Sequence, residues 1–236
     1  MNSSSGIIDL IFPEKCPFCG RMKGRVKGPA DVLCDRCSNE LFIYDKADEL
    51  PHEALEKVLR LYVPLRYSGA AKKAMLRYKF GQEQWLYRPF SQIMHIFLEA
   101  NDGYSDIDVI TCVPVSAKRF AQRGYDQSRL IARAISGLSG KPFRDLLRRN
   151  DTGWRNIATS TENFAQRASE RRFSASRDDF CLFGTRILLV DDIFTTGSTL
   201  NECAGILLEH GALYVNAACM MSGRQDIYAF GREESA

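Results

Sequence analysis

One stretch of the chain, residues 187–199, restricts the possible folds more than any other part of the sequence. It reads Ile-Leu-Leu-Val-Asp-Asp-Ile-Phe-Thr-Thr-Gly-Ser-Thr. Its four apolar residues, Ile187 to Val190, are too few for a helix and are typical of a buried strand in a parallel sheet. Helical spacing follows from Leu200 to His210 and ends at Gly211. The order of strand, acidic pair, loop and helix predicts an α/β fold.

The loop between this strand and this helix has the composition of a phosphate site. Backbone N–H groups of such a loop and the helix N-terminus attract an anion. A glycine allows the backbone to approach the anion closely. The residues that we expect to contact the phosphate are Thr195, Thr196, Gly197, Ser198 and Thr199.

Two adjacent carboxylates, Asp191 and Asp192, come where the strand is expected to end. They cannot hold phosphate, but carboxylates accept hydrogen bonds from the vicinal hydroxyls of a ribose. An ordinary strand, turn and helix with an acidic corner, as in receiver domains, remains an alternative. A nucleotide P-loop needs Lys before the final Ser or Thr, and here Gly197 is followed directly by Ser198. A dinucleotide site needs three spaced glycines, which are absent.

Further strands and helices alternate along the chain. A central strand is expected at Ile107–Val115, a last strand at Ala212–Met221, and an edge strand or hairpin arm at Val58–Tyr67. Alternation of this kind predicts a doubly wound, mostly parallel sheet with right-handed crossovers. The expected helices are Ala70–Phe80, Trp85–Ala100 and Gln127–Leu138, and Lys141–Arg149 is expected to form a short strand or turn.

The stretch 187–199 resembles the phosphoribosyl-pyrophosphate motif of type I phosphoribosyltransferases. The resemblance implies that phosphoribosyl pyrophosphate binds with Mg²⁺, its 5-phosphate on the hydroxylated loop and its ribose on the acidic pair. In that family the loop after an earlier strand holds the pyrophosphate. The matching residues here are Ser116, Ala117, Lys118 and Arg119. No dedicated acid or base is expected, so the catalytic residues stay unknown.

Four of the eight cysteines form two Cys-x-x-Cys pairs near the N-terminus, at Cys16, Cys19, Cys34 and Cys37. Two such knuckles suit tetrahedral zinc, and four protein thiolates leave no open position for catalysis. Redox pairs or disulfides are the alternatives. We expect a small structural-zinc module with a linker helix at residues 1–58 and a phosphoribosyltransferase-like domain at residues 59–236.

The composition and the N-terminal sequence bear on where the protein is located in the cell. The 236-residue chain is 45% hydrophobic and 26% charged, contains no apolar run of about 18 residues, and does not begin like a signal peptide. We therefore expect a cytoplasmic protein without membrane insertion.

The net charge of +3 is unevenly distributed. Residues 118–177 hold fourteen Lys/Arg against five Asp/Glu, a net +9, which leaves −6 for the rest of the chain. This segment could track single-stranded DNA by charge and stacking, although solvated helix faces explain the same charges. Residues 150–180, a long, polar and poorly periodic stretch, are expected to form a flexible hood that closes over the site and excludes water. The aromatic candidates for base stacking are Phe120, Tyr125, Trp154 and Phe164.

Three features together resemble the ComF family of competence-associated, phosphoribosyltransferase-like proteins: the paired cysteine knuckles, the segment Arg123–Ser128, and Leu189–Thr199. The segment Tyr78–Gln82 is similar to a lysine-phenylalanine segment of that family, which usually has Asn where Asp126 stands. The resemblance implies a role in DNA uptake, with single-stranded DNA and other uptake proteins as partners. An active phosphoribosyltransferase of nucleotide salvage and a nucleotide-sensing regulator without turnover remain alternatives.

Overall fold

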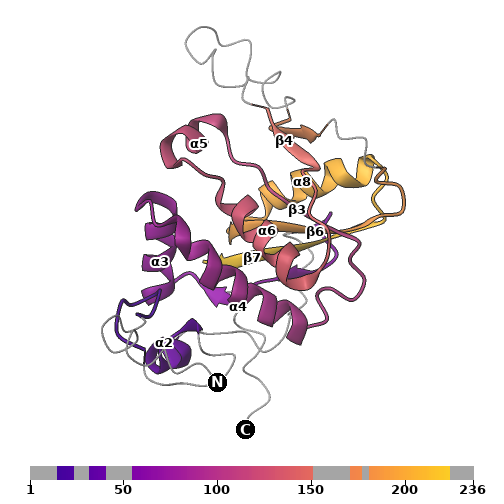
Figure 1. Cartoon of the computed structure of the whole chain (residues 1–236). Coiled ribbons are helices and arrows are strands. Elements are labelled where there is room, and N and C mark those ends of the chain that lie inside the picture. Colours follow the sequence, from indigo (N-terminus) through magenta and orange to yellow (C-terminus); the bar gives the residue numbers. More distant parts are fainter. Residues whose placement is uncertain (1–14, 24–31, 41–54, 151–170, 177–180, 224–236) are drawn as a thin grey trace, which may run out of the picture.

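The computed structural model describes residues 15–23, 32–40, 55–150, 171–176 and 181–223 (Figure 1). A parallel sheet lies at its centre, in the strand order β1-β7-β6-β3. The bounds of these strands are β1 Leu61–Tyr62, β3 Val109–Cys112, β6 Arg186–Phe194 and β7 Tyr214–Ser222, and a further short strand, β2 Leu65–Arg66, also pairs with β7.

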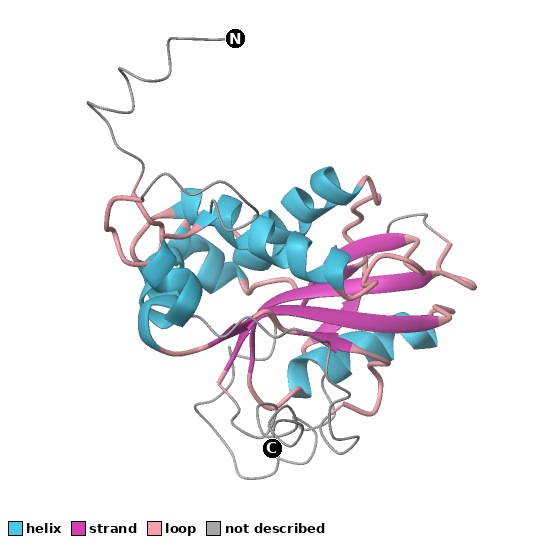
Figure 2. Ribbon diagram, turned by 90° about the horizontal axis from the view of Figure 1, so that it is seen from below, coloured by secondary structure: helices cyan, strands magenta, loops and turns pink. Residues whose placement is uncertain are grey.

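Helices cover both faces of this sheet, as Figure 2 shows. On one face lie α3, Gly69–Phe80, α4, Tyr87–Ala100, which follows the short η2 at Gln84–Leu86, and α6, Gln127–Ser139. The helix α8, Ser198–Glu209, covers the other face. The doubly wound, mostly parallel α/β fold expected from the sequence is therefore confirmed.

Strand β6 is buried on both faces. Leu188 and Val190 pack among the residues of α3, α4 and α6, whereas Ile187 and Leu189 pack on the side of α8. Full burial of each such side chain stabilises the fold by about 1.5–3 kcal/mol. A continuous apolar run, instead of an alternating one, follows directly from this two-sided burial.

The segment around Pro64 forms an edge of the sheet, as expected, but it is not a hairpin. Leu61 pairs with Ala217 and Leu65 with Met221, so β1 and β2 both run parallel to β7. Proline lacks a backbone N–H and interrupts the ladder between them.

A two-stranded antiparallel ribbon corrects part of the expected hood. Strand β4, Leu147–Arg149, pairs with β5, Phe173–Ala175, which the sequence analysis had placed in a loop. Phe173 is fully buried, and the guanidinium groups of Arg149 and Arg172 lie over its ring. Residues 151–170 and 177–180 lie outside the described residues, so closure of a hood over the site stays a prediction.

The cysteine module packs directly on the helical layer. The ring of Phe18 contacts that of Phe90 on α4 edge to face, with centroids 5.5 Å apart, and Arg77 on α3 donates a hydrogen bond to the Pro17 carbonyl. The expected linker helix falls mostly on residues 41–54, outside the described residues, and the domain boundary near residue 58 stays a prediction. Within the described ranges no helix has the length and hydropathy needed to cross a membrane.

Candidate functional site

The acidic pair lies at the carboxyl edge of the sheet, inside strand β6. Because Cys112 pairs with Val190, β3 stops one residue before the first carboxylate. The pairing of β6 with β7 continues to Phe194, so the expectation that the strand ends at the acidic pair was wrong. Continued pairing with β7 on both sides of Asp192 fixes the backbone of the acidic pair, whereas β3 ends before it.

Asp191 is held in place by two hydrogen bonds to one carboxylate oxygen. Its Oδ1 accepts from the hydroxyl of Ser128 on α6 at 3.0 Å and from the backbone N–H of Asp192 at 2.8 Å. Burial and the neighbouring charge of Asp192 raise the pKa of the Asp191 carboxyl to about 7, although the two hydrogen bonds and Lys79 act in the other direction. The anionic form of Asp191 is therefore costly in the free protein, and a cationic or hydrogen-bonding ligand would relieve this cost.

Asp192 forms an ion pair with a lysine from a distant part of the chain. Its Oδ2 lies 2.7 Å from Nζ of Lys79, near the C-terminus of α3, and the two side chains are only 14% and 15% exposed. Helix α3 is fixed here by Tyr78, whose hydroxyl donates to the Gln127 carbonyl and whose own carbonyl accepts from Tyr125. These hydrogen bonds of Tyr78 thus hold α3 in the position that places the Lys79 ammonium beside the acidic pair.

The loop after β6 has the backbone expected of a phosphate site. Gly197 has φ 80° and ψ −10°, a left-handed conformation that glycine adopts at little cost, and it is the N-cap residue of α8. The N-cap glycine offers no side chain to cap this helix, and within the described residues only the Ser198 N–H has a side-chain acceptor, the Thr196 hydroxyl at 3.4 Å. The first turn therefore keeps capacity to bind an anion. The hydroxyl of Thr196 donates to that of Ser198 at 3.1 Å, and Thr195, Thr196 and Ser198 are exposed. Thr199 is partly exposed on the first turn.

The expected pyrophosphate residues lie after β3 but form the start of a helix instead of a turn. Helix α5 spans Ala117–Arg123, and Ser116 is its N-cap, with Oγ accepting from the Arg119 N–H at 3.3 Å. Ala117, Lys118 and Arg119 are exposed on the first turn. Since β3 and β6 are parallel, this turn follows the same sheet edge as the acidic pair.

Asp126 ties this connection to the next helix, which gives a structural reason for its presence. One carboxylate oxygen accepts from the Arg129 N–H and caps α6, while the other accepts from the Val115 N–H at 3.2 Å. An asparagine in the same position would turn its NH₂ group toward one of these two N–H donors, so only one of the two bonds would remain. Burial raises the pKa of Asp126, although both backbone hydrogen bonds oppose this.

Several side chains without an expected role in the site lie beside the acidic pair. Lys79 and Ser128 contact it directly, and Arg123 lies over the ring of Phe80 at 4.9 Å and donates to Gln127. A signal did exist, because these residues belong to the two segments Tyr78–Gln82 and Arg123–Ser128 that resemble family segments. What the sequence lacked was the spatial relation between α3, α6 and β6.

The raised pKa of Asp191 predicts a specific pH dependence of stability. The unfolded chain ionises Asp191 near its ordinary pKa of about 3.9, whereas the folded protein retains the proton up to about pH 7. The folded state therefore binds more protons between these values, and the free energy of unfolding should fall as pH rises through this window. The free energy of unfolding of Asp191→Asn minus that of the wild type should rise between pH 4 and about pH 7, and above pH 7 this difference should stay constant. Urea unfolding at a series of pH values measures this difference, and a pH-independent difference would contradict the prediction.

The four paired cysteines meet in one cluster. The Sγ atoms of Cys16, Cys19, Cys34 and Cys37 all lie within 4.8 Å of one another. Zinc–sulfur bonds of about 2.3 Å place tetrahedral sulfurs about 3.8 Å apart, so the cluster fits zinc with a small contraction. Burial acts to raise the pKa of the Cys16 thiol, but backbone N–H groups near it lower this pKa to about 7. Burial raises the pKa of the Cys34 and Cys37 thiols, so a bound cation is needed to hold these two as thiolates. All eight cysteines are free thiols, which does not support the disulfide alternative.

The structure changes the interpretation of the basic segment. Tyr125 is buried and cannot stack on a base, whereas Phe120 is half exposed. Four arginines of the segment form ion pairs with acids: Arg129 and Arg133 with Asp145, Arg171 with Glu209, and Arg172 with Glu202. Trp154 and Phe164 lie outside the described residues. The net charge of this segment thus overstates the free positive surface that it offers to DNA.

The fold and the site together define a phosphoribosyl transferase domain, and the model of the family with that description matches residues 90–229. The model of the double zinc ribbon domain matches residues 7–47. Competence protein ComFC of Streptococcus pneumoniae (strain ATCC BAA-255 / R6) is 30% identical over 205 residues, 86% of this chain and 79% of that protein. The chain belongs to the ComF family.

Two other similarities are partial. The DNA utilization protein YhgH of Escherichia coli O157:H7 is 32% identical over 115 residues, which cover 48% of each chain. A solved structure of glutamine phosphoribosylpyrophosphate amidotransferase from B. subtilis, complexed with ADP and GMP, has a TM-score of 0.41 and 21% identity, covering 57% of this chain and 26% of that chain. The zinc ribbon match and the cysteine cluster together support a structural Zn²⁺ ion.

Proposed function

We propose that this ComF-family protein binds phosphoribosyl pyrophosphate with Mg²⁺ at the carboxyl edge of the sheet and acts in DNA uptake. The observation that carries the proposal is the juxtaposition on one strand and its loop: two carboxylates near the end of β6, followed within six residues by a helix N-terminus whose N-cap residue is glycine. Asp191 and Asp192 would accept hydrogen bonds from the ribose hydroxyls. The loop Thr195–Thr199 would hold the 5-phosphate through backbone N–H groups and hydroxyls.

The diphosphate would lie toward the first turn of α5. Ser116 and Ala117 supply backbone N–H groups there, and Lys118 and Arg119 supply positive charge. Mg²⁺ prefers oxygen ligands from carboxylates and phosphates, and the destabilised anion of Asp191 fits a nearby divalent cation. When bound, this ion would neutralise part of the charge on a leaving diphosphate.

Two observations on the chain bear on turnover. The exposed cations of α5 could stabilise a departing pyrophosphate, and the Ser128 hydroxyl orients Asp191. A phosphoribosyltransferase of nucleotide salvage and a nucleotide sensor without turnover use the same ligand contacts. They differ in whether an acceptor base reaches the anomeric carbon.

The proposed biological role comes from the relatives. Proteins described as a competence protein and as a DNA utilization protein are similar to this chain, the first over most of its length. We extend that context to this protein, with single-stranded DNA and other DNA-uptake proteins as partners. Direct binding of DNA would then fall steeply with salt concentration.

Isothermal calorimetry with phosphoribosyl pyrophosphate and Mg²⁺ tests the ligand. Removing both carboxylate charges in an Asp191→Asn, Asp192→Asn variant should weaken binding by about 100-fold or more, since hydrogen bonds to charged groups contribute about 1.5–3 kcal/mol each. Asp106→Asn is a matched control, because Asp106 is 73% exposed before β3, at the opposite edge of the sheet. Equal affinity of the double variant and the wild type would refute the assignment. Pyrophosphate release in the presence of a panel of bases, and of single-stranded DNA, then separates transferase from sensor.

A further inference from the structure

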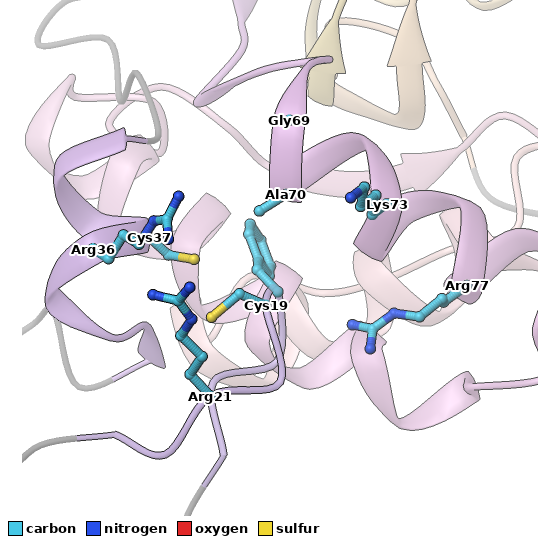
Figure 3. Close-up of a pocket in the computed structure, with 9 residues that line it drawn as sticks. Cys19, Arg21, Arg36, Cys37, Gly69, Ala70, Lys73 and Arg77 are labelled. Atoms are coloured by element: carbon cyan, nitrogen blue, oxygen red, sulfur yellow. The ribbon is translucent and has the colours of Figure 1, made fainter.

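A pocket of about 500 Å³ lies between the cysteine module and α3 (Figure 3). Three separate segments of the chain build its wall: the first cysteine knuckle, α2 (Asp35–Glu40) and α3. Its nine lining residues include Arg21, Arg36, Gly69, Ala70, Lys73 and Arg77.

Positive charge dominates this lining. Four of the nine residues are Lys or Arg, and none is Asp or Glu. Figure 3 shows Arg21 and Arg36 on the cysteine side and Lys73 and Arg77 on α3. Arg77 is anchored by its bond to the Pro17 carbonyl and lies 3.7 Å from a Glu83 oxygen, so part of its charge is already compensated. Cations brought together from three segments, without an acid among them, indicate an anionic ligand.

The start of α3 adds to this potential. Gly69 and Ala70, its first two residues, line the pocket, and the side chain of the N-cap residue Ser68 makes no capping hydrogen bond. The backbone N–H groups of the first turn of a helix have no partner within the helix, and they carry its partial positive charge. α3 has twelve residues, which is long enough for this effect.

A simpler explanation accounts for only part of the charge. A zinc ion with four thiolates carries a net charge of −2, because each thiolate contributes −1. Arg21 and Arg36, which flank the cysteines, are sufficient to compensate it. Lys73, which is exposed on α3, and the N-terminus of that helix are then left as an excess of positive charge.

We propose that this pocket binds a phosphate group that belongs to a nucleotide. Its volume falls within the range of about 300–1,000 Å³ for small-molecule sites, so inorganic phosphate alone would not fill it. Two sources share this chemistry: a free mononucleotide, or one nucleotide of a single-stranded nucleic acid. The site is separate from the acidic pair, because Lys73 and Lys79 are six residues apart, about 9 Å along the helix axis. The inference therefore does not depend on the proposed function.

Charge reversal at Lys73 tests the proposal in the zinc-loaded full-length protein. Two probes, a fluorescent ten-nucleotide oligothymidylate and AMP, distinguish the two sources of the phosphate. Lys73→Glu should weaken binding of at least one probe by about tenfold or more, because a cation at the phosphate becomes a repelling anion. Lys72→Glu is the matched control: Lys72 is also exposed on α3 but does not line the pocket. It should change the affinity by less than about twofold at equal salt.

Lysine footprinting of the unmodified protein provides a second measurement that needs no variant. With saturating probe, acylation of Lys73 by an amine-reactive ester should fall while that of Lys72 stays unchanged. Protection by AMP identifies a mononucleotide site, and protection by the oligonucleotide alone identifies a site for a strand. Absence of binding by both probes, equal losses in the two variants, or equal protection of the two lysines would each overturn the proposal.

Discussion

Replacement of Cys37 by Ser should remove the metal and unfold the cysteine module. Cys37 is 1% exposed, and its Sγ belongs to the cluster of four thiols that fits zinc. A module of this size has little hydrophobic core, and metal binding must therefore supply most of its folding energy. In zinc-finger peptides, zinc binding has an apparent free energy of about 10–16 kcal/mol. We expect zinc content to fall from one equivalent to none. Amide exchange at residues 15–23 and 32–40 should accelerate by about 1,000-fold or more, since every 1.4 kcal/mol is a factor of ten.

The effect should extend into the large domain. Phe18 packs edge to face on Phe90, and Arg77 bonds to the Pro17 carbonyl, so loss of the module exposes the outer side of α3. Cys181→Ser is the matched control, because Cys181 is exposed and lies outside the cluster. Zinc content by mass spectrometry and amide exchange check both variants. A Cys37→Ser protein that keeps its zinc and its exchange protection would contradict a structural metal site.

The ion pair between Lys79 and Asp192 should contribute a large part of the stability of the acidic site. Lys79→Met leaves two neighbouring carboxylates, Asp191 and Asp192, without their cation in a site where the pair is about 85% buried. Breaking a buried pair from one side costs about 3–5 kcal/mol, and the residual exposure here reduces this to about 2–4 kcal/mol. The loss of stability in Lys79→Met arises from repulsion between the carboxylates of Asp191 and Asp192. Removal of one of these two negative charges should therefore restore part of the lost stability.

A double-mutant cycle measures this coupling. Asp192→Asn in the Lys79→Met background should recover at least about 1 kcal/mol of the free energy of unfolding in urea. Lys72→Met serves as a control for loss of a lysine from α3, since the Lys72 ammonium lies over the Tyr67 ring at 5.5 Å and contacts no carboxylate described here. Strictly additive effects of Lys79→Met and Asp192→Asn would show that the ion pair contributes nothing to stability.

The proposed ligand site and the proposed nucleotide pocket both involve α3. The helix presents Lys79 to the acidic pair near its C-terminus and Lys73 to the pocket nearer its N-terminus. One rigid helix thus connects the zinc module to the sheet edge. This connection gives a physical reason for a zinc module and a phosphoribosyl transferase domain to occur in one chain.

Local patterns determined the parts of the fold that depend on neighbouring residues alone. Four consecutive apolar residues predicted the two-sided burial of β6, and Gly197 predicted the left-handed backbone before α8. Two knuckles of fixed spacing predicted the cluster of four cysteines. In each case the chemistry of a few adjacent residues leaves only one stable arrangement.

Contacts between distant segments decided the rest. Nothing near Asp192 in the sequence indicates Lys79, which is 113 positions away, and helix packing alone brings them to 2.7 Å. Strand β5 follows a long polar stretch without periodicity, and its pairing with β4 depends on burial of Phe173. Tyr125 has the appearance of a base-stacking residue in the sequence, but it is buried against Tyr78. The sequence by itself thus determined the succession of strand, acidic pair, loop and helix and the cluster of four cysteines, because their residues are close neighbours. Only the tertiary structure decided which charges surround them, because helix packing on the sheet sets those distances.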